Sequence, residues 1–215
     1  NPQQKQPNGL IRFLFIGLHF RTKGGPEALQ AFYDSKGDHL RLTVISDVPK
    51  DIKARYAKDS RITFFAPLPR QQLFSEIYPN HDVLLFPSLY ESFGMAILEA
   101  LSFGLGIIAV HVYAVPEMVE NGRNGLLLPH PCLSSRSFSD RKLINPLFMT
   151  LLKFEKRHGN ANPFFESLYQ NIKKAIAESF LKKDEWKSAS LDIFQERFSP
   201  EIWKKKIQRL FLNER

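Results

Sequence analysis

Short apolar runs alternate with mixed polar and apolar segments along the first 130 residues of the chain. The apolar runs predict six buried strands, at 11–17 (IRFLFIG), 40–46 (LRLTVIS), 61–67 (RITFFAP), 82–88 (DVLLFPS), 106–110 (GIIAV) and 124–129 (NGLLLP). The segments between them predict helices, at 25–37 (GPEALQAFYDSKG), Pro49–Lys58, Pro69–Tyr78, from about Phe93–Ala96 onward and Val115–Glu120. Continuous apolar strands that alternate strictly with helices indicate a parallel sheet covered on both faces. The predicted fold of residues 10–130 is therefore α/β, a Rossmann-like three-layer αβα domain with a six-stranded parallel sheet.

The segments that flank this core have a different character. Residues 1–9 are polar and proline-rich and are predicted to be a linker, whereas residues 131–163 are predicted to be an insertion. Residues 164–215 are predicted to supply closing helices, from three helical patterns at Asn162–Lys182, Asp184–Phe198 and Pro200–Arg215. In the insertion, apolar positions at 147–152 precede basic ones at 153–158. Two interpretations of this stretch stay open, a helix packed on its own domain and a membrane-surface helix.

Composition narrows the class of protein. The single cysteine, Cys132, excludes a disulfide within the chain and a zinc site with several cysteines, and it favours a reducing, cytoplasmic setting. Residues 1–130 hold 13 Lys and Arg against 12 Asp and Glu, whereas residues 131–215 hold 17 against 10. Solvated helix faces are the ordinary explanation of such basic runs, and an anionic membrane is the alternative. Nucleic acid is not expected, because the basic residues have no interleaved aromatics and belong to no known module.

Several familiar motifs are missing or misplaced. Residues 104–109, GLGIIA, match a dinucleotide fingerprint by letters, but they follow a predicted helix and open a strand, which is the reverse of what that fingerprint needs. The histidines form neither an HExxH motif nor a metal-like cluster, and there is no GxSxG elbow. The sequence thus gives no reason to expect a metal or a serine nucleophile.

The segment YESFGMAILEALSFG, residues 90–104, carries a more informative pattern. Glu91 follows a predicted strand and should lie at the carboxyl edge of the sheet, where open α/β sheets bind ligands. Gly94 permits a close approach of the backbone, and the helix start at about Phe93–Ala96 offers free N–H groups to a phosphate. Met95, Ile97 and Leu98 are predicted to be core residues of this helix. For Phe93, packing beneath the loop and a place beside the ligand are both open.

The spacing of the two glutamates limits how they can act. If the segment were helical throughout, Glu91 and Glu99 would be separated by roughly 12 Å along the axis. The carboxyl groups of a glycosidase lie only about 5–10 Å apart, which disfavours an acid and nucleophile pair. Two carboxylates on either side of a phosphate site could instead bind the two ends of one extended ligand that has hydroxyls at both ends. A nucleotide sugar has that shape.

Four segments, in the correct order, resemble retaining glycosyltransferases of the GT-B fold, family 4, also called glycosyl transferases group 1. ESFGMAILE resembles the E-x7-E motif of that family, and FLFIGLHFRTKGG its first strand and glycine-lysine loop. DVLLFPSLYESFG resembles the strand and loop before the motif, and VPEMVENGRNGLLLP resembles a later run of the family that begins with Pro-Glu and contains G-x-N-G. The end of the chain is similar to the closing helices of the family. The resemblance covers most of the chain except residues 131–163.

The resemblance implies a role for individual residues. Glu91 would contact the hydroxyls of the donor sugar, Glu99 the ribose, and Lys23 the diphosphate, so that Glu91 and Lys23 are the candidate catalytic residues. The implied donor-binding residues are Gly17, Arg21, Lys23, Glu91, Ser92, Phe93, Gly94, Met95, Ala96 and Glu99. No metal or other cofactor is implied. A hexose carried by UDP is the expected donor, and a glycan or a lipid-linked molecule the expected acceptor.

A GT-B enzyme has two Rossmann-like domains, and the resemblance assigns residues 10–215 to the donor-binding one. The expected partner is an N-terminal acceptor domain, which this sequence does not contain, so the chain alone is expected to bind nucleotide and to transfer sugar poorly or not at all. A cytoplasmic protein with peripheral contact at the inner membrane face is the corresponding expectation for its location.

Two departures from the family pattern support an alternative function. Leu18 stands where the family has arginine, a charge that the nearby Arg21 would have to replace, and Tyr113-Ala114 stand where it has two glycines. A degenerate module that binds nucleotide or a partner without catalysis is therefore the alternative. An epimerase or a phosphorylase on the same fold is less favoured, since a pyridoxal-binding lysine signature is missing.

Overall fold

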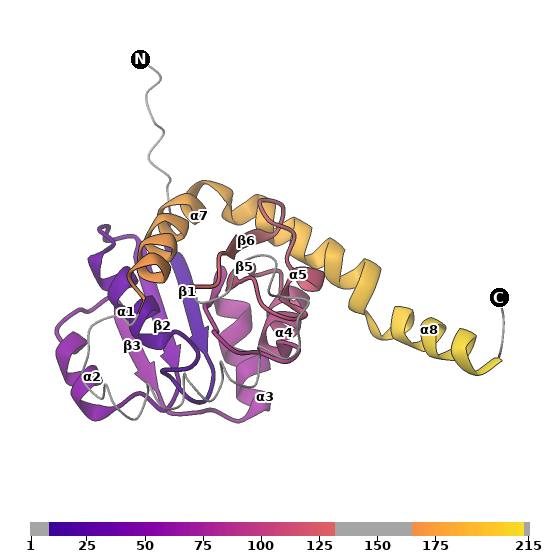
Figure 1. The fold of residues 1–215 in the computed structure, drawn as a ribbon, viewed down its shortest axis with the longest axis horizontal. Helices are drawn as coiled ribbons and strands as arrows, with labels where there is room; N and C mark the ends of the chain where they lie inside the picture. The colour runs from indigo at the N-terminus through magenta and orange to yellow at the C-terminus, as the bar shows by residue number, and fades with distance from the viewer. Residues whose placement is uncertain (1–8, 132–164, 213–215) are drawn as a thin grey trace, which may run out of the picture.

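Six parallel strands form one sheet at the centre of the molecule (Figure 1). The computed structural model describes residues 9–131 and 165–212. The strands are β1 Ile11–Ile16, β2 Leu40–Ile45, β3 Ile62–Phe65, β4 Val83–Phe86, β5 Gly106–Val110 and β6 Gly125–Leu128. They lie side by side in the order β3-β2-β1-β4-β5-β6, and every pairing is parallel. The predicted Rossmann-like sheet is confirmed.

Short helices connect the strands. They are α1 Gly25–Asp34, α2 Lys50–Tyr56, α3 Arg70–Gln72, η1 Leu73–Ile77, η2 Tyr78–Asn80, α4 Met95–Ser102 and α5 Val115–Met118. The single helix predicted for 69–78 is instead a short α-helical start followed by a π-helical turn and a 3-10 turn. Pro79 accounts for part of this change, because it has no N–H to continue an α-helical ladder.

The core lies on both faces of the sheet. Every residue of β4 and β5 is buried, as expected of a parallel sheet with a helix layer on each side. The edge strand β3 alternates instead, with Ile62 buried and Phe65 exposed. Each fully buried aliphatic side chain contributes about 1.5–3 kcal/mol through removal of its surface from water.

One long helix, α7 Glu166–Ile193, replaces the first two predicted closing helices, so the predicted break near Lys183 is wrong. No Gly or Pro interrupts this stretch, and its buried face continues past the expected break to Trp186, Ser190 and Ile193. Trp186 packs directly on β5, where a Cβ at Gly106 would lie 2.6 Å from the indole.

The end of the chain reaches away from the sheet (Figure 1). A π-helical turn, η3 Phe194–Phe198, leads into α8 Pro200–Leu212, which exposes Trp203, Ile207 and Phe211 at intervals of four residues. Among the helices in residues 9–131 and 165–212, none combines the length and the apolar character that a membrane span requires. Nearly all of the linker and of the insertion lies outside the described residues, and so does the helix considered for 147–158.

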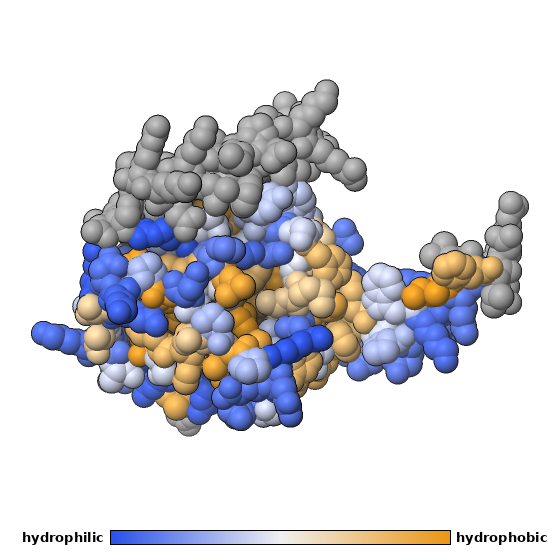
Figure 2. Space-filling model, turned by 90° about the horizontal axis from the view of Figure 1, so that it is seen from below, coloured by the Kyte–Doolittle hydropathy of each residue, from blue (hydrophilic) through white to orange (hydrophobic). Residues whose placement is uncertain are grey.

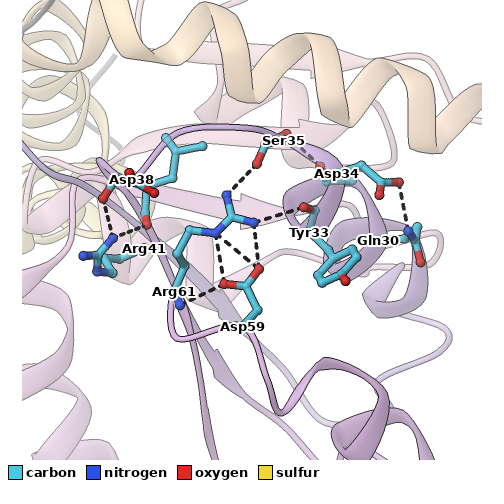
Figure 3. Close-up of polar contacts among 10 residues, drawn as sticks. Gln30, Tyr33, Asp34, Ser35, Asp38, Arg41, Asp59 and Arg61 are labelled. Carbon is cyan, nitrogen blue, oxygen red and sulfur yellow. Dashed lines mark hydrogen bonds and ion pairs between the residues drawn. The ribbon is translucent and has the colours of Figure 1, made fainter.

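An ion pair holds the amino edge of the sheet together (Figure 3). Arg61, which precedes β3, donates through Nη2 to Asp59 at 2.7 Å, and it also donates to the carbonyls of Ser35 and Tyr33 at 2.6 and 3.0 Å. These carbonyls belong to the end of α1, where helix carbonyls have no partner within the helix. The guanidinium hydrogen bonds hold the pKa of the Asp59 carboxyl below its usual value. Arg61 thus supplies donors to carbonyls at the end of α1.

Candidate functional site

The sheet reverses its strand order between β1 and β4. From β1 the chain continues to β2 on one side, and from β4 it continues to β5 on the other, so the loops after the two strands diverge. In open α/β sheets such a point forms a crevice at the carboxyl edge, and ligands bind there. The arrowheads of β1, β2 and β3 point to the bottom of Figure 1, so Figure 2, seen from below, looks onto this edge.

The two loops at the switch point touch each other. The backbone N–H of Leu89 donates to the carbonyl of Thr22 at 3.1 Å. At Gly24, with φ 70°, a Cβ would lie 2.3 Å from the carbonyl oxygen of Pro87. Only glycine allows this approach, which brings the residues after β1 against those after β4.

An ion pair joins the two loops at this point. Lys23 Nζ lies 2.6 Å from Glu91 Oε2 and donates to the carbonyl of Tyr90 at 3.3 Å. The two side chains are 20% and 15% exposed, so the pair is shielded yet reachable. Gly17 lies beside the lysine stem, since a Cβ there would be 3.4 Å from Lys23 Cγ. The structure therefore brings together the candidate residues Gly17, Lys23 and Glu91.

The N-terminus of α4 lies next to Glu91. Gly94 caps the helix with φ 94°, and the backbone N–H of Ser92 donates to Glu91 Oε1 at 3.1 Å. The first N–H groups of a helix lack partners within it, and the positive end of its dipole favours an anion. Met95 and Ala96 open this first turn.

The side chains of this segment follow the core prediction only in part. Ile97 is fully buried and Leu98 is partly buried against the core. Met95 is 53% exposed, so its assignment to the core is wrong. Met95 is the first residue of α4, directly after the Gly94 cap, so no preceding helical turn covers its side chain. Phe93 is half-buried and packs against the core.

Glu99 is held by two side chains that sequence reasoning missed. Its Oε1 accepts from Arg70 Nε at 3.0 Å, and its Oε2 accepts from the Tyr78 hydroxyl at 2.9 Å. Tyr78 is fully buried, and burial together with the charge of Glu99 raises the pKa of its hydroxyl. Both partners stand more than 20 positions before Glu99, and no sequence motif links them to it.

An apolar cavity of about 220 Å³ opens at the carboxyl ends of β1 and β2. Its lining consists of Ile16, Gly17, Leu18, Ile45, Pro67, Leu68 and Leu73. Leu18, the departure from the family pattern, is thus a wall of this cavity and 56% exposed. Arg21 lies in the same loop, and its Nη1 is shielded from solvent.

A larger cavity of about 450 Å³ lies elsewhere, between the end of α1, the start of β2 and α7. Its walls come from the amino edge of the sheet, including His39, Leu40 and Phe180. Size favours this cavity, but it lies away from the diverging loops and from every candidate residue. The smaller cavity has the switch point beside it, and for that reason we assign the site to the carboxyl edge.

The second departure, Tyr113, also borders the site. It has φ 48°, a left-handed conformation that costs energy for any residue with a side chain. Its ring packs edge-on against Tyr90, with centroids 5.6 Å apart, and burial raises the pKa of its hydroxyl to about 12. The Tyr113 ring therefore packs against Tyr90, the residue that precedes Glu91. In residues 9–131 and 165–212, no three His, Cys, Asp or Glu side chains gather as a metal site.

A doubly wound parallel sheet, with a cation, a carboxylate and a helix N-terminus at its switch point, defines a Rossmann-like domain with a candidate ligand site at its carboxyl edge. The chain belongs to the family described as glycosyl transferases group 1, whose model matches residues 11–139. The resemblance found in the sequence is confirmed.

Solved structures share the fold. The pneumococcal O-GlcNAc transferase GtfA, in complex with UDP and GlcNAc, matches with a TM-score of 0.63 and 19% identity, over 94% of this chain and 37% of that one. Anabaena HepE, in complex with UDP and glucose, matches with a TM-score of 0.63 and 17% identity, over 96% of this chain and 49% of that one. At such identities the likeness concerns the fold alone.

Curated relatives are longer proteins. The UDP-N-acetylglucosamine–peptide N-acetylglucosaminyltransferase GtfA subunit of Streptococcus parasanguinis is 27% identical over 164 residues, which are 76% of this chain and 30% of that protein. A D-inositol 3-phosphate glycosyltransferase of Mycobacteroides abscessus is 38% identical over 69 residues, 32% of this chain and 15% of that protein. The chain spans about a third or less of the length of these relatives.

Proposed function

We propose that residues 10–215 are the donor-binding domain of a retaining glycosyltransferase that transfers a hexose from UDP to a glycan or lipid-linked acceptor. The observation that carries this proposal is the Lys23–Glu91 pair, which lies at the switch point beside the N-terminus of α4. The family supports the reaction class. The complexes of two structural relatives with UDP and a sugar support the choice of donor.

The site could hold the four parts of such a donor in their covalent order, which is base, ribose, diphosphate and hexose. The base would enter the apolar cavity beside Leu18 and Leu68, and the ribose would reach Glu99. The diphosphate would lie between Lys23 and the first turn of α4, and the hexose would meet Glu91. Ser92, Phe93 and the neighbouring backbone would complete the contacts around the phosphate.

The chemistry follows from the same contacts. When the bond between the hexose and the diphosphate breaks, negative charge grows on the phosphate oxygens, and Lys23 with the α4 N-terminus would stabilise it. Donor binding requires Lys23 to leave Glu91 for the phosphate. Glu91 then accepts from sugar hydroxyls instead of from the ammonium. These groups supply positive charge without a metal ion, and none is part of the proposal.

The acceptor and the other half of the reaction belong to a partner domain. We place that domain N-terminal to residue 10 in the complete enzyme, as in the GT-B fold, and expect residues 10–215 alone to bind the donor without turnover. A cytoplasmic enzyme with peripheral contact to the inner membrane face fits a lipid-linked acceptor.

A second candidate is a binding module without catalysis, and the observation that favours it is Tyr113. This strained residue packs against Tyr90, directly before Glu91, and its ring would narrow the space for a hexose. Such a module would bind UDP as tightly as UDP-hexose, whereas the donor domain would prefer the sugar-bearing ligand.

Calorimetric titration with UDP, GDP and ADP, each with and without a hexose, tests the proposal. We expect saturable binding of UDP and tighter binding of a UDP-hexose. In Glu91→Gln the advantage of the sugar should fall by about 10-fold or more, because hydrogen bonds to a charged group are lost. UDP itself should bind this variant slightly more tightly, since Lys23 is released. If no nucleoside diphosphate binds, the proposal is wrong.

A further inference from the structure

Both oxygens of Glu99 already have a partner within the protein. Arg70 donates to Oε1 and the Tyr78 hydroxyl donates to Oε2. An ionised carboxylate has about four lone-pair positions, two on each oxygen. One position therefore stays open on each oxygen of Glu99, and the two vicinal hydroxyls of a ribose would fill them.

We propose that Tyr78 and Arg70 are positioning residues that orient Glu99 for the recognition of a ribose, so that the site distinguishes ribonucleotides from nucleotides without ribose hydroxyls. The inference rests on the proposed function, since it specifies which part of the donor meets Glu99. Neither residue needs to touch the ligand.

Tyr78 is well suited to fix a direction. Its ring is fully buried, stacked on Phe103 with centroids 5.5 Å apart and packed edge-on against Phe74 at 5.7 Å. A hydroxyl on such an immobile ring has a fixed origin, and because a carboxylate only accepts, the hydroxyl must donate.

The turn that carries Tyr78 is itself anchored to the sheet. His81 Nδ1 donates to the carbonyl of Ile77 at 2.6 Å, because a carbonyl can only accept. In the neutral ring Nε2 then accepts from the Thr43 hydroxyl on β2, at 2.8 Å. The position of Tyr78 is therefore tied to the strand beside which the apolar cavity opens.

Arg70 provides the charge on the other side. Its side chain is 70% exposed and lies over the Phe74 ring, with 4.9 Å from the guanidinium carbon to the ring centroid. The cation pairs with Glu99 at 3.0 Å and would offset the repulsion between this carboxylate and the diphosphate of a donor. Removal of the Arg70 cation should weaken the binding of all nucleoside diphosphates. Removal of the tyrosine hydroxyl should instead reduce the preference for nucleotides that carry the ribose hydroxyls.

The test compares UDP with 2′,3′-dideoxy-UDP by calorimetry. For the parent protein we expect the dideoxy compound to bind about 10-fold or more weakly, since two hydrogen bonds to a charged group are lost. In Tyr78→Phe the ratio of the two Kd values should fall by about 3- to 10-fold, which is the effect of a misdirected carboxylate. In Arg70→Met, an exposed position that does not threaten folding, both Kd values should rise and the ratio should also fall.

Tyr56→Phe is the matched control. Tyr56 is another buried tyrosine, and its hydroxyl donates to Gln30 Oε1 away from the site, so its removal should leave the ratio unchanged. If Tyr78→Phe changes both Kd values by one factor and keeps the ratio, the residue is merely structural and the inference is wrong. A ratio near one in the parent protein also overturns it. If the parent binds neither compound, the proposed function fails instead.

Discussion

Two ion pairs of this domain look alike in burial but differ in what surrounds them. Arg61 and Asp59 are 16% and 10% exposed, and Lys23 and Glu91 are 20% and 15% exposed. The first pair lies at the amino edge of the sheet, where Arg61 also donates to two helix carbonyls (Figure 3). The second lies at the carboxyl edge, between loops that diverge at the switch point.

The difference teaches that a short, shielded ion pair is not by itself a sign of function. Arg61 satisfies groups that the fold leaves without partners, so its contacts belong to the folded state. The Lys23 ammonium donates to one carboxylate and one carbonyl and lies over the Phe86 ring, 5.6 Å from its centroid. The two hydrogen bonds can be exchanged for a phosphate without unfolding the domain. Location at the switch point, together with exchangeable partners, separates the candidate site from the structural pair.

Substitution of the structural pair should have the largest effect on stability. Arg61→Met keeps the aliphatic stem but leaves Asp59 and the carbonyls of Ser35 and Tyr33 without their donor. We expect the free energy of unfolding to fall by about 2–3 kcal/mol in chemical denaturation, because shielded polar groups lose their partners. The Kd of UDP for the folded variant should stay within about twofold of the parent value. An unchanged midpoint would contradict the structural role.

Substitution of the switch-point pair should give the opposite pattern. Lys23→Met also keeps the stem that packs beside Gly17, and Glu91 remains partly solvated. We expect the Kd of UDP to rise by about 10- to 100-fold, the range for loss of a charge-assisted hydrogen bond. The free energy of unfolding should change by about 1 kcal/mol or less, because a partly exposed ion pair contributes little. If Lys23→Met lost much stability and bound UDP like the parent, the Lys23–Glu91 pair would be structural and the account would be contradicted.

The sequence predicted the sheet well because its signal is local. Each strand is a continuous apolar run, such as 82–88, and each boundary has its own glycine, proline or charge. The helix prediction failed at Lys183 for a related reason. A pair of lysines followed by an aspartate is typical of a helix boundary. The helix continues instead, because Trp186 is buried against Gly106 on β5, which lies 80 positions earlier in the chain.

The same limit applies to the site. Lys23, Glu91 and Gly94 lie in recognisable segments, and the strand order brings those segments together. Arg70 on α3 and Tyr78 on the 3-10 turn η2 carry no motif, and only their hydrogen bonds to Glu99 on α4 reveal that they hold it. Long-range side-chain partners of this kind depend on the packed structure, which a single sequence does not contain.

The central claim is that a nucleoside diphosphate binds at the switch point, and amide chemical-shift mapping with UDP tests it most directly. The account predicts shifts in residues 17–25, 68–78 and 90–99, and unchanged amides in residues 33–38, 59–61 and the α7 segment around Phe180. Shifts confined to those last segments, which surround the larger cavity and the Arg61 cluster, would contradict it.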